Sequence, residues 1–144
     1  MTDTIRKTLR DSKVARWSAL AVVAFTMLTG YYLTDVIAPL KGLLEGQIGW
    51  TSDDFGTFNS AYGWFNVFLG MLIIGGIILD KMGVRFTGLT AAIVMVAGTM
   101  IKYWAVSTHS LDNQMIFGIK SQVMIAGLGF AIFAVGVEVA GITV

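Results

Sequence analysis

Four long apolar runs alternate with short polar links along the chain. The runs cover residues 17–40, 54–79, 86–106 and 120–144. Each is long enough to cross the hydrocarbon core of a bilayer as a helix, which takes about 20 residues. Because apolar stretches of this length with few charges are typical of transmembrane helices, we predict one helix over each run. The pattern therefore predicts an all-α polytopic membrane protein whose four transmembrane helices form a bundle.

The basic residues predict the orientation of these helices. Most of the ten lysines and arginines lie either in the polar segment 1–16 or in the link 76–85, and only Lys41, Lys102 and Lys120 lie on the other side. Positive charge is enriched in cytoplasmic segments. We therefore predict a cytoplasmic basic tail over 1–16 and a transmembrane domain over 17–144, placed in the plasma (inner) membrane with the N-terminus in the cytoplasm.

Local patterns mark the outer ends of the predicted helices. The sequence Thr51-Ser52-Asp53-Asp54 predicts a helix start, with a hydroxyl cap and acids near the positive end of the helix dipole. Trp50 and the group Lys102-Tyr103-Trp104 are predicted to lie at the outer headgroup level, where aromatic and long basic side chains are common.

Composition supports the membrane class and excludes others. Hydrophobic residues make up 56% of the chain, charged residues 13%, and the mean hydropathy is +0.75. The 17 glycines favour close packing of helices, for example at Gly127 and Gly129. The absence of cysteine excludes disulfides and thiolate metal sites, and a net charge of +1 argues against nucleic-acid binding. With no nucleophile beside a base, we predict no enzymatic activity, no cofactor and no metal.

The link 76–85 carries the most specific motif, Gly76-Ile77-Ile78-Leu79-Asp80-Lys81-Met82-Gly83-Val84-Arg85. It resembles the signature loop between the second and third helices of the major facilitator superfamily, Gly-x-Leu-Ala-Asp-Arg-x-Gly-Arg-Arg. Gly76, Asp80, Gly83 and Arg85 match, and Lys81 keeps the charge. The resemblance implies a charge latch at Asp80 that stabilises one access state of a transporter, with Gly76 and Gly83 allowing close backbone approach and Lys81 and Arg85 holding the cytoplasmic surface. The plainer interpretation is a positively charged turn that fixes topology only.

The resemblance also implies a function and a larger protein. Superfamily members move small solutes by alternating access, as symporters, antiporters or uniporters, with the site between two six-helix halves. We therefore expect this chain to be an N-terminal fragment whose partners are a small-molecule substrate, a coupling proton or other ion, the bilayer and the missing C-terminal helices. Val123 stands where the family's proton-antiporter drug exporters carry an arginine, which argues against that subgroup.

Six polar residues in the apolar runs are candidates for a substrate or proton path, because ionisable and polar groups within lipid are costly and commonly functional. Each has a plainer interpretation. The asparagines suit hydrogen bonding between packed helices, Asp35 suits a solvated outer rim, and Glu138 suits a structural ion pair with Lys81 or Arg85. The candidates are Tyr31, Asp35, Asn59, Tyr62, Asn66 and Glu138.

A second class of function stays open from sequence. A complete four-helix membrane protein would be a dimeric small multidrug exporter or a subunit of a membrane complex. Small exporters centre on a glutamate in their first helix, whereas the first run here holds only Asp35, near its outer end. This difference counts against the exporter.

Overall fold

The computed structural model describes residues 12–111 and 114–143, and within them the chain is mostly helical. Three helices are long and apolar enough to cross a membrane: α1 (Lys13–Asp35), α5 (Met71–Ser107) and α6 (Ser121–Ile142). Shorter elements connect them. These are α2 (Lys41–Leu43), the π-helical turn η2 (Leu44–Ile48), α3 (Ser52–Ser60), α4 (Tyr62–Phe68), the 3-10 turn η3 (His109–Leu111) and a hairpin of β1 (Met115–Ile116) and β2 (Ile119–Lys120).

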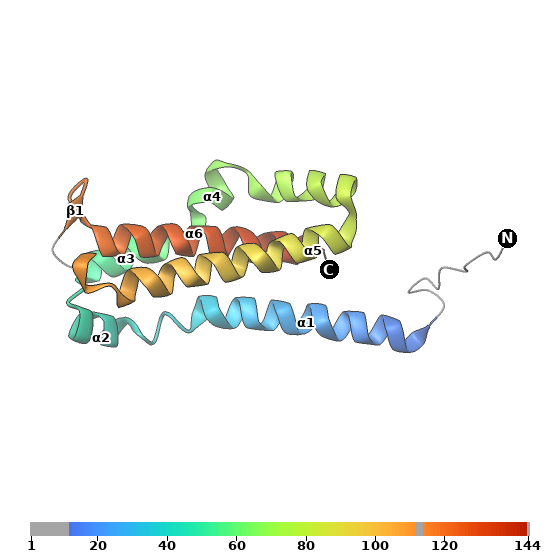
Figure 1. Cartoon of the computed structure of the whole chain (residues 1–144), viewed down its shortest axis with the longest axis horizontal. Coiled ribbons are helices and arrows are strands. Elements are labelled where there is room, and N and C mark those ends of the chain that lie inside the picture. The colour runs from blue at the N-terminus through green and yellow to red at the C-terminus, as the bar shows by residue number, and fades with distance from the viewer. Residues whose placement is uncertain (1–11, 112–113, 144) are drawn as a thin grey trace.

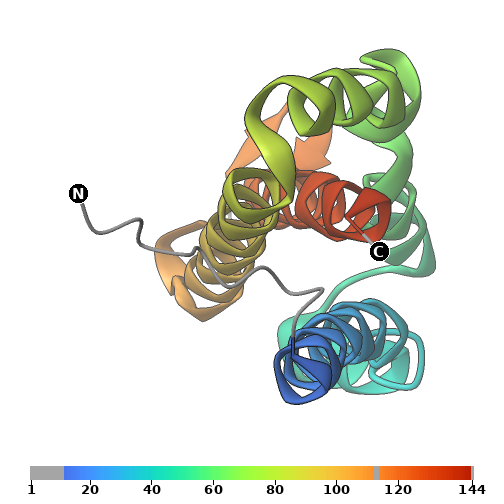
Figure 2. The same cartoon turned by 90° about the vertical axis from the view of Figure 1, so that its right-hand side faces the viewer.

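Helix α6 is the centre of the bundle. Most of its side chains are buried, and it contacts α5 most extensively, followed by α4, α3 and α1. Figure 1 shows the long helices side by side, and the end-on view in Figure 2 places α1 on one side of α6 and the first half of α5 on the other. Because α6 is predominantly apolar and has no continuous polar face, it is suited to this enclosed position.

Helix α5 consists of two antiparallel halves, 71–82 and 84–107, that meet at Gly83. The backbone of Gly83 has φ 80° and ψ 166°, a conformation that is essentially restricted to glycine. The sequence predicted a loop over 76–85, but residues 76–82 are helical and the chain reverses at Gly83 alone.

The second predicted helix, 54–79, is interrupted. It is divided among α3, α4 and the first half of α5, with Gly70 in the left-handed conformation at φ 57° between the last two. Its predicted start is confirmed: Thr51 is the N-cap of α3 and forms a reciprocal capping box with Asp54.

The other helix boundaries differ less from prediction. The first helix covers 13–35 instead of 17–40, because Ser12 caps it through the N–H of Ala15 and Pro39 disfavours helix near its far end. The third and fourth predicted helices, 86–106 and 120–144, correspond to residues 84–107 and 121–142.

Glycines bring α5 and α6 into close contact. A Cβ on Gly98 would meet the backbone N of Phe133 and would lie 2.6 Å from the carbonyl oxygen of Gly129. A Cβ on Gly136 would lie 2.8 Å from the carbonyl oxygen of Ala91. The packing role predicted for Gly129 is therefore confirmed, and we call Gly98, Gly129 and Gly136 the glycine seam.

Candidate functional site

A tyrosine and a glutamate from different helices form a polar pair in the apolar bundle. The hydroxyl of Tyr62, at the start of α4, donates a hydrogen bond of 2.7 Å to Oε1 of Glu138 in α6. Both residues are half-buried, and Glu138 lies between the buried residues Val137 and Val139. A hydrogen bond to a carboxylate is stronger than one between neutral groups, and more so away from water. The pair therefore links α4 to α6.

The ring of Tyr62 packs on the core of α6. Its centroid lies 5.6 Å from that of Phe130, which is buried and stacks in turn on Phe58 of α3. The amide nitrogen of Asn66 donates to the carbonyl oxygen of Tyr62 at 3.1 Å, one turn along α4. The other polar atom of this amide, Oδ1, is buried and accepts no hydrogen bond from the described residues. Tyr62 is thus held by packing on one side and a polar neighbour on the other.

Helix α1 contributes two further candidates to this region. Tyr31 and Asp35 lie close enough to the Tyr62 phenol to interact with it electrostatically, and both are exposed on the surface of the bundle. The structure therefore joins two of the six path candidates directly, Tyr62 and Glu138, and places Tyr31 and Asp35 of α1 within electrostatic reach of Tyr62. Asn66 lies beside them, whereas Asn59 is exposed on α3.

The ion-pair partners predicted for Glu138 are not its partners in the structure. Lys81 and Arg85 are exposed at the reversal between the two halves of α5. The carboxylate of Glu138 instead accepts a hydrogen bond from the hydroxyl of Tyr62. Of the other motif residues, Asp80 and Gly83 are exposed and Gly76 is half-buried. Within residues 12–111 and 114–143, Asp80 forms no ion pair.

Two residues predicted at the headgroup level point into the protein instead. The ammonium of Lys102 lies over the rings of Phe130 and Phe133, at 4.8 and 4.5 Å from their centroids. Trp50 is 3% exposed, and its Nε1 donates to Oε1 of Gln122 at 2.8 Å. Tyr103 and Trp104 are exposed, as expected for the predicted interface position.

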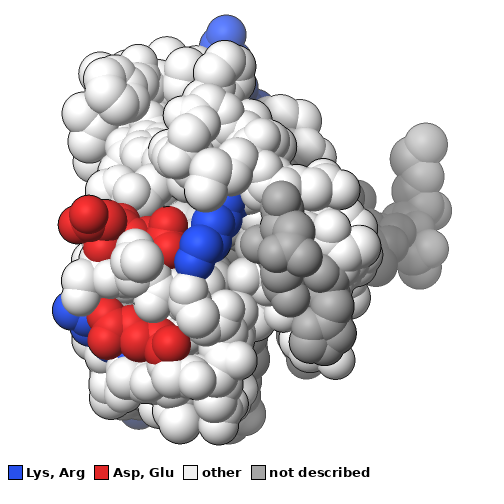
Figure 3. All heavy atoms as spheres, turned by 90° about the vertical axis from the view of Figure 1, so that its left-hand side faces the viewer, with Lys and Arg blue, Asp and Glu red and all other residues white. Residues whose placement is uncertain are grey.

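An ion pair ties the first turn of α3 to the residue that precedes α6. Nζ of Lys120 lies 3.0 Å from Oδ2 of Asp54 and also donates to the carbonyl oxygen of Gly49. Figure 3 shows acidic and basic side chains next to one another at this end of the molecule. Partial burial acts to raise the pKa of Asp54, but the hydrogen bonds from Thr51 and Lys120 prevail and hold it below its ordinary value of 3.8.

We expect this ion pair to make stability depend on acid pH. Because the pKa of Asp54 is lower in the folded state, its stabilisation is complete above the unfolded-state value and is lost as the pH falls through the folded-state value. The thermal midpoint measured from about pH 7 to pH 3 should therefore fall less in Asp54→Asn than in the wild type. Asp53→Asn is the matched control, since Asp53 is exposed and makes no ion pair with the residues described. Equal acid sensitivity in the wild type and Asp54→Asn would contradict this account.

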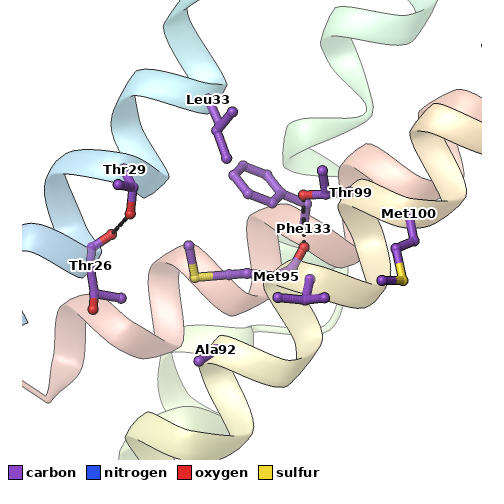
Figure 4. Close-up of a pocket in the computed structure, with 9 residues that line it drawn as sticks. Thr26, Thr29, Leu33, Ala92, Met95, Thr99, Met100 and Phe133 are labelled. Atoms are coloured by element: carbon purple, nitrogen blue, oxygen red, sulfur yellow. Dashed lines mark hydrogen bonds between the residues drawn. The ribbon is translucent and has the colours of Figure 1, made fainter.

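A cavity of about 420 Å³ lies between α1, α5 and α6. Its lining is almost wholly apolar, because the hydroxyls of Thr26, Thr29 and Thr99 donate to carbonyl oxygens of their own helices. Figure 4 shows two of these bonds, from Thr29 and from Thr99, beside Met95 and Phe133. The Tyr62–Glu138 pair is not part of this lining. The cavity is therefore large enough for a small molecule but has few polar groups that could hydrogen-bond to one.

No family model, curated protein or solved structure matches this chain.

Proposed function

We propose that this chain is part of a secondary active transporter that moves a small solute across a membrane by alternating access, coupled to a proton carried by Glu138. The observation that carries the proposal is the hydrogen bond from Tyr62 to Glu138, which places a titratable pair between α4 and α6. Ionisable residues in membrane bundles are costly, and they commonly mark ion or substrate paths. Tyr31 and Asp35 extend the polar region onto α1.

Protonation of Glu138 would change how α4 and α6 are joined. A carboxylate accepts the hydrogen bond from Tyr62, whereas a protonated carboxyl group carries its own donor and competes for the same geometry. The preference between two arrangements of the helices would then depend on the proton, as coupling requires. No cofactor and no covalent step are needed, so we assign no enzymatic activity.

The arrangement of the helices supports four crossings of the bilayer. Besides α1 and α6, we assign one crossing to α4 with the first half of α5 and one to residues 84–107, which extend for about 36 Å. The start of α1 and the reversal of α5 lie at the same end of the bundle. Because Lys13, Arg16, Lys81 and Arg85 lie at this end, we place it in the cytoplasm and the protein in the plasma membrane.

The exposed charges at the reversal support the latch implied by the superfamily motif. Asp80 lies near the C-terminal end of the first half of α5, where a negative charge is unfavourable for the helix dipole, and it makes no ion pair with the described residues. We propose that further helices of the same protein supply its partner. The break at Gly83 also occurs at a position that the motif requires to be glycine.

The test is solute uptake by the natural gene product that contains this chain. Proteoliposomes with an acidic exterior would be incubated with a mixture of small anions, cations and neutral solutes, and their contents measured by mass spectrometry. We expect one class of solute to accumulate in proportion to the pH gradient and to be released by a protonophore. Contents identical to those of protein-free liposomes would refute the proposal. Uptake or efflux by the 144-residue chain alone would favour the small four-helix exporter.

A further inference from the structure

The hairpin between α5 and α6 has an apolar tip that the rest of the described chain leaves uncovered. Strands β1 and β2 pair Ile116 with Ile119. Phe117 and Gly118 therefore form a two-residue turn between them. Phe117 is 96% exposed, and Met115 on β1 is 71% exposed. Apolar side chains gathered on an exposed turn commonly mark a contact with lipid or with another protein.

The backbone at the tip is unfavourable for the residue that occupies it. Phe117 has φ 53°, and among the described residues no other side chain except glycine has a positive φ. Gly118 follows at φ 82°. Two positive φ values in succession are typical of a type I′ turn, for which Asn-Gly is a preferred pair. Because a Cβ is disfavoured in this conformation, phenylalanine does not help to form the turn. A contact of its ring outside the hairpin accounts for its presence there.

The hairpin lies at the level of the helix ends. Lys120, the last residue of β2, directly precedes α6, and the side-chain amide of Gln122 donates to the carbonyl oxygen of Val106 near the end of α5. Residues 84–107 and 121–142 each extend for more than about 30 Å, the thickness of the hydrocarbon core. In Figure 1 the hairpin points across the long axis of the bundle. Where these helices cross a bilayer, the tip therefore lies beside the bundle at the depth of the headgroups.

The groups around the tip suit lipid better than a charged partner. Residues 114–119 carry no charge, and the ammonium of Lys120 is already paired with Asp54. Tyr103 and Trp104, near the adjacent end of α5, are exposed as well. Aromatic side chains are enriched at membrane–water interfaces, where one part of the side chain is apolar and another is hydrated. The hairpin thus adds apolar groups at a depth where exposed aromatic residues already lie.

We propose that the hairpin tip is a membrane anchor, with Phe117 and Met115 inserted between the headgroups and the acyl chains of the bilayer. The partner is the lipid surface, and because the tip carries no charge, the contact does not depend on anionic headgroups. Burial of the Phe117 ring in lipid offsets the unfavourable φ of this residue. The inference requires only that the long helices cross a membrane, so it holds for either orientation and for any transported solute.

A fluorescent label beside Phe117 tests the anchor without transport. The chain has no cysteine, so Met115→Cys provides one labelling site within it, in the natural gene product with any other cysteines replaced by serine. The labelled protein would be placed in phosphatidylcholine discs that contain lipids with a nitroxide quencher near the headgroup end of an acyl chain. We expect strong quenching at position 115 and little at Asp53→Cys, an exposed position at the start of α3. Added phosphatidylglycerol should leave both values unchanged.

Two variants of Phe117 make the result decisive. Phe117→Asn removes the ring but gives the turn an Asn-Gly pair, so the hairpin keeps its conformation. We expect the ratio of anchored to free hairpins, measured from the quenching at position 115, to fall on the order of 10- to 100-fold, as for the loss of one large apolar side chain from lipid. Phe117→Trp should retain the anchor.

Two outcomes would overturn the anchor. The first is equal quenching at position 115 with Phe117 and with Phe117→Asn. The second is quenching at position 115 no greater than at Asp53→Cys, in which case protection of the label from aqueous iodide would assign the tip to a protein contact instead. A failed uptake assay would refute transport and leave the anchor standing.

Discussion

Replacing Glu138 with glutamine is expected to abolish proton-coupled uptake by the natural gene product while leaving its fold intact. Glutamine keeps the size of the side chain and can still accept from the Tyr62 hydroxyl, but it cannot release a proton near neutral pH. We expect the dependence of uptake on the pH gradient to fall on the order of 100-fold, near the upper range of coupling free energies between linked sites. Gradient-driven uptake in proteoliposomes measures this directly.

A matched control and a second variant separate coupling from structure. Glu45→Gln makes the same chemical change outside the candidate site, at a glutamate whose Oε1 lies 3.7 Å from Nζ of Lys41. This variant should transport solute at the wild-type rate. Tyr62→Phe keeps the packing on Phe130 but removes the donor, at a cost to stability of about 1–3 kcal/mol. If Glu138→Gln lowers the thermal midpoint yet keeps full coupling to the gradient, the pair is structural and our assignment of the proton site is wrong.

Gly98→Ala is expected to give the largest loss of stability among single-methyl substitutions in α5. The added Cβ would overlap the backbone of Phe133 and Gly129. Backbone atoms cannot relieve such an overlap by a change of rotamer, as a flexible side chain can. Forcing such an overlap costs about 3 kcal/mol or requires α5 and α6 to separate. Unfolding of the reconstituted protein in a denaturing detergent, followed by helical circular dichroism, would show the loss.

Gly88→Ala, in the same half of α5, is the comparison for this prediction. Apart from the neighbouring residues and the surrounding backbone of its own helix, no described atom lies within 4 Å of a Cβ at Gly88, so alanine there should be neutral or stabilising by up to about 1 kcal/mol through helix propensity. The two variants differ only in what the new methyl group meets. Equal stability of Gly98→Ala and Gly88→Ala would mean that the glycine seam is looser than the structure has it.

The sequence predicted the apolar helices well and their interruptions poorly. The two predicted helices that form the tightest contact, 86–106 and 120–144, lie within two residues of the observed boundaries. The run 54–79 looked uniform because hydropathy does not register backbone conformation, so the left-handed Gly70 was hidden in an apolar stretch. A glycine in such a run packs a helix or breaks it, and composition alone does not distinguish the two.

The spacing of buried residues along α5 indicates that Lys102 faces the protein, which the count of basic residues on each side of the membrane does not reveal. Ala91, Met95 and Gly98 follow one another at four and three residues and are buried, and Lys102 is the next position on that stripe. The prediction that Lys102 lies at the outer headgroup level assumed that the side chain of a lysine near a helix end extends toward the headgroups. The spacing alone predicts that this lysine faces α6.

The pairing at the candidate site lay beyond sequence reasoning. Tyr62 and Glu138 were each candidates because polar residues are rare in such runs, but they are 76 residues apart and nothing in either run specifies the partner. Their approach depends on where α4 packs along α6, which is set by Phe58 and Phe130. Glu138 was paired instead with the nearest cations in the predicted topology.

The central position of α6 has a consequence for assembly during synthesis. The most enclosed of the described helices, α6, is also the last of them to be made, so α1, α3, α4 and α5 are synthesised before the surface that joins them exists. The two halves of α5 are separated by a single residue and can insert as one hairpin with little loss of loop entropy. Until α6 arrives, that hairpin presents Gly98 to lipid or to other chains. The order of translation therefore makes the docking of α6, and the quality control that acts before it, a vulnerable stage in the assembly of these helices.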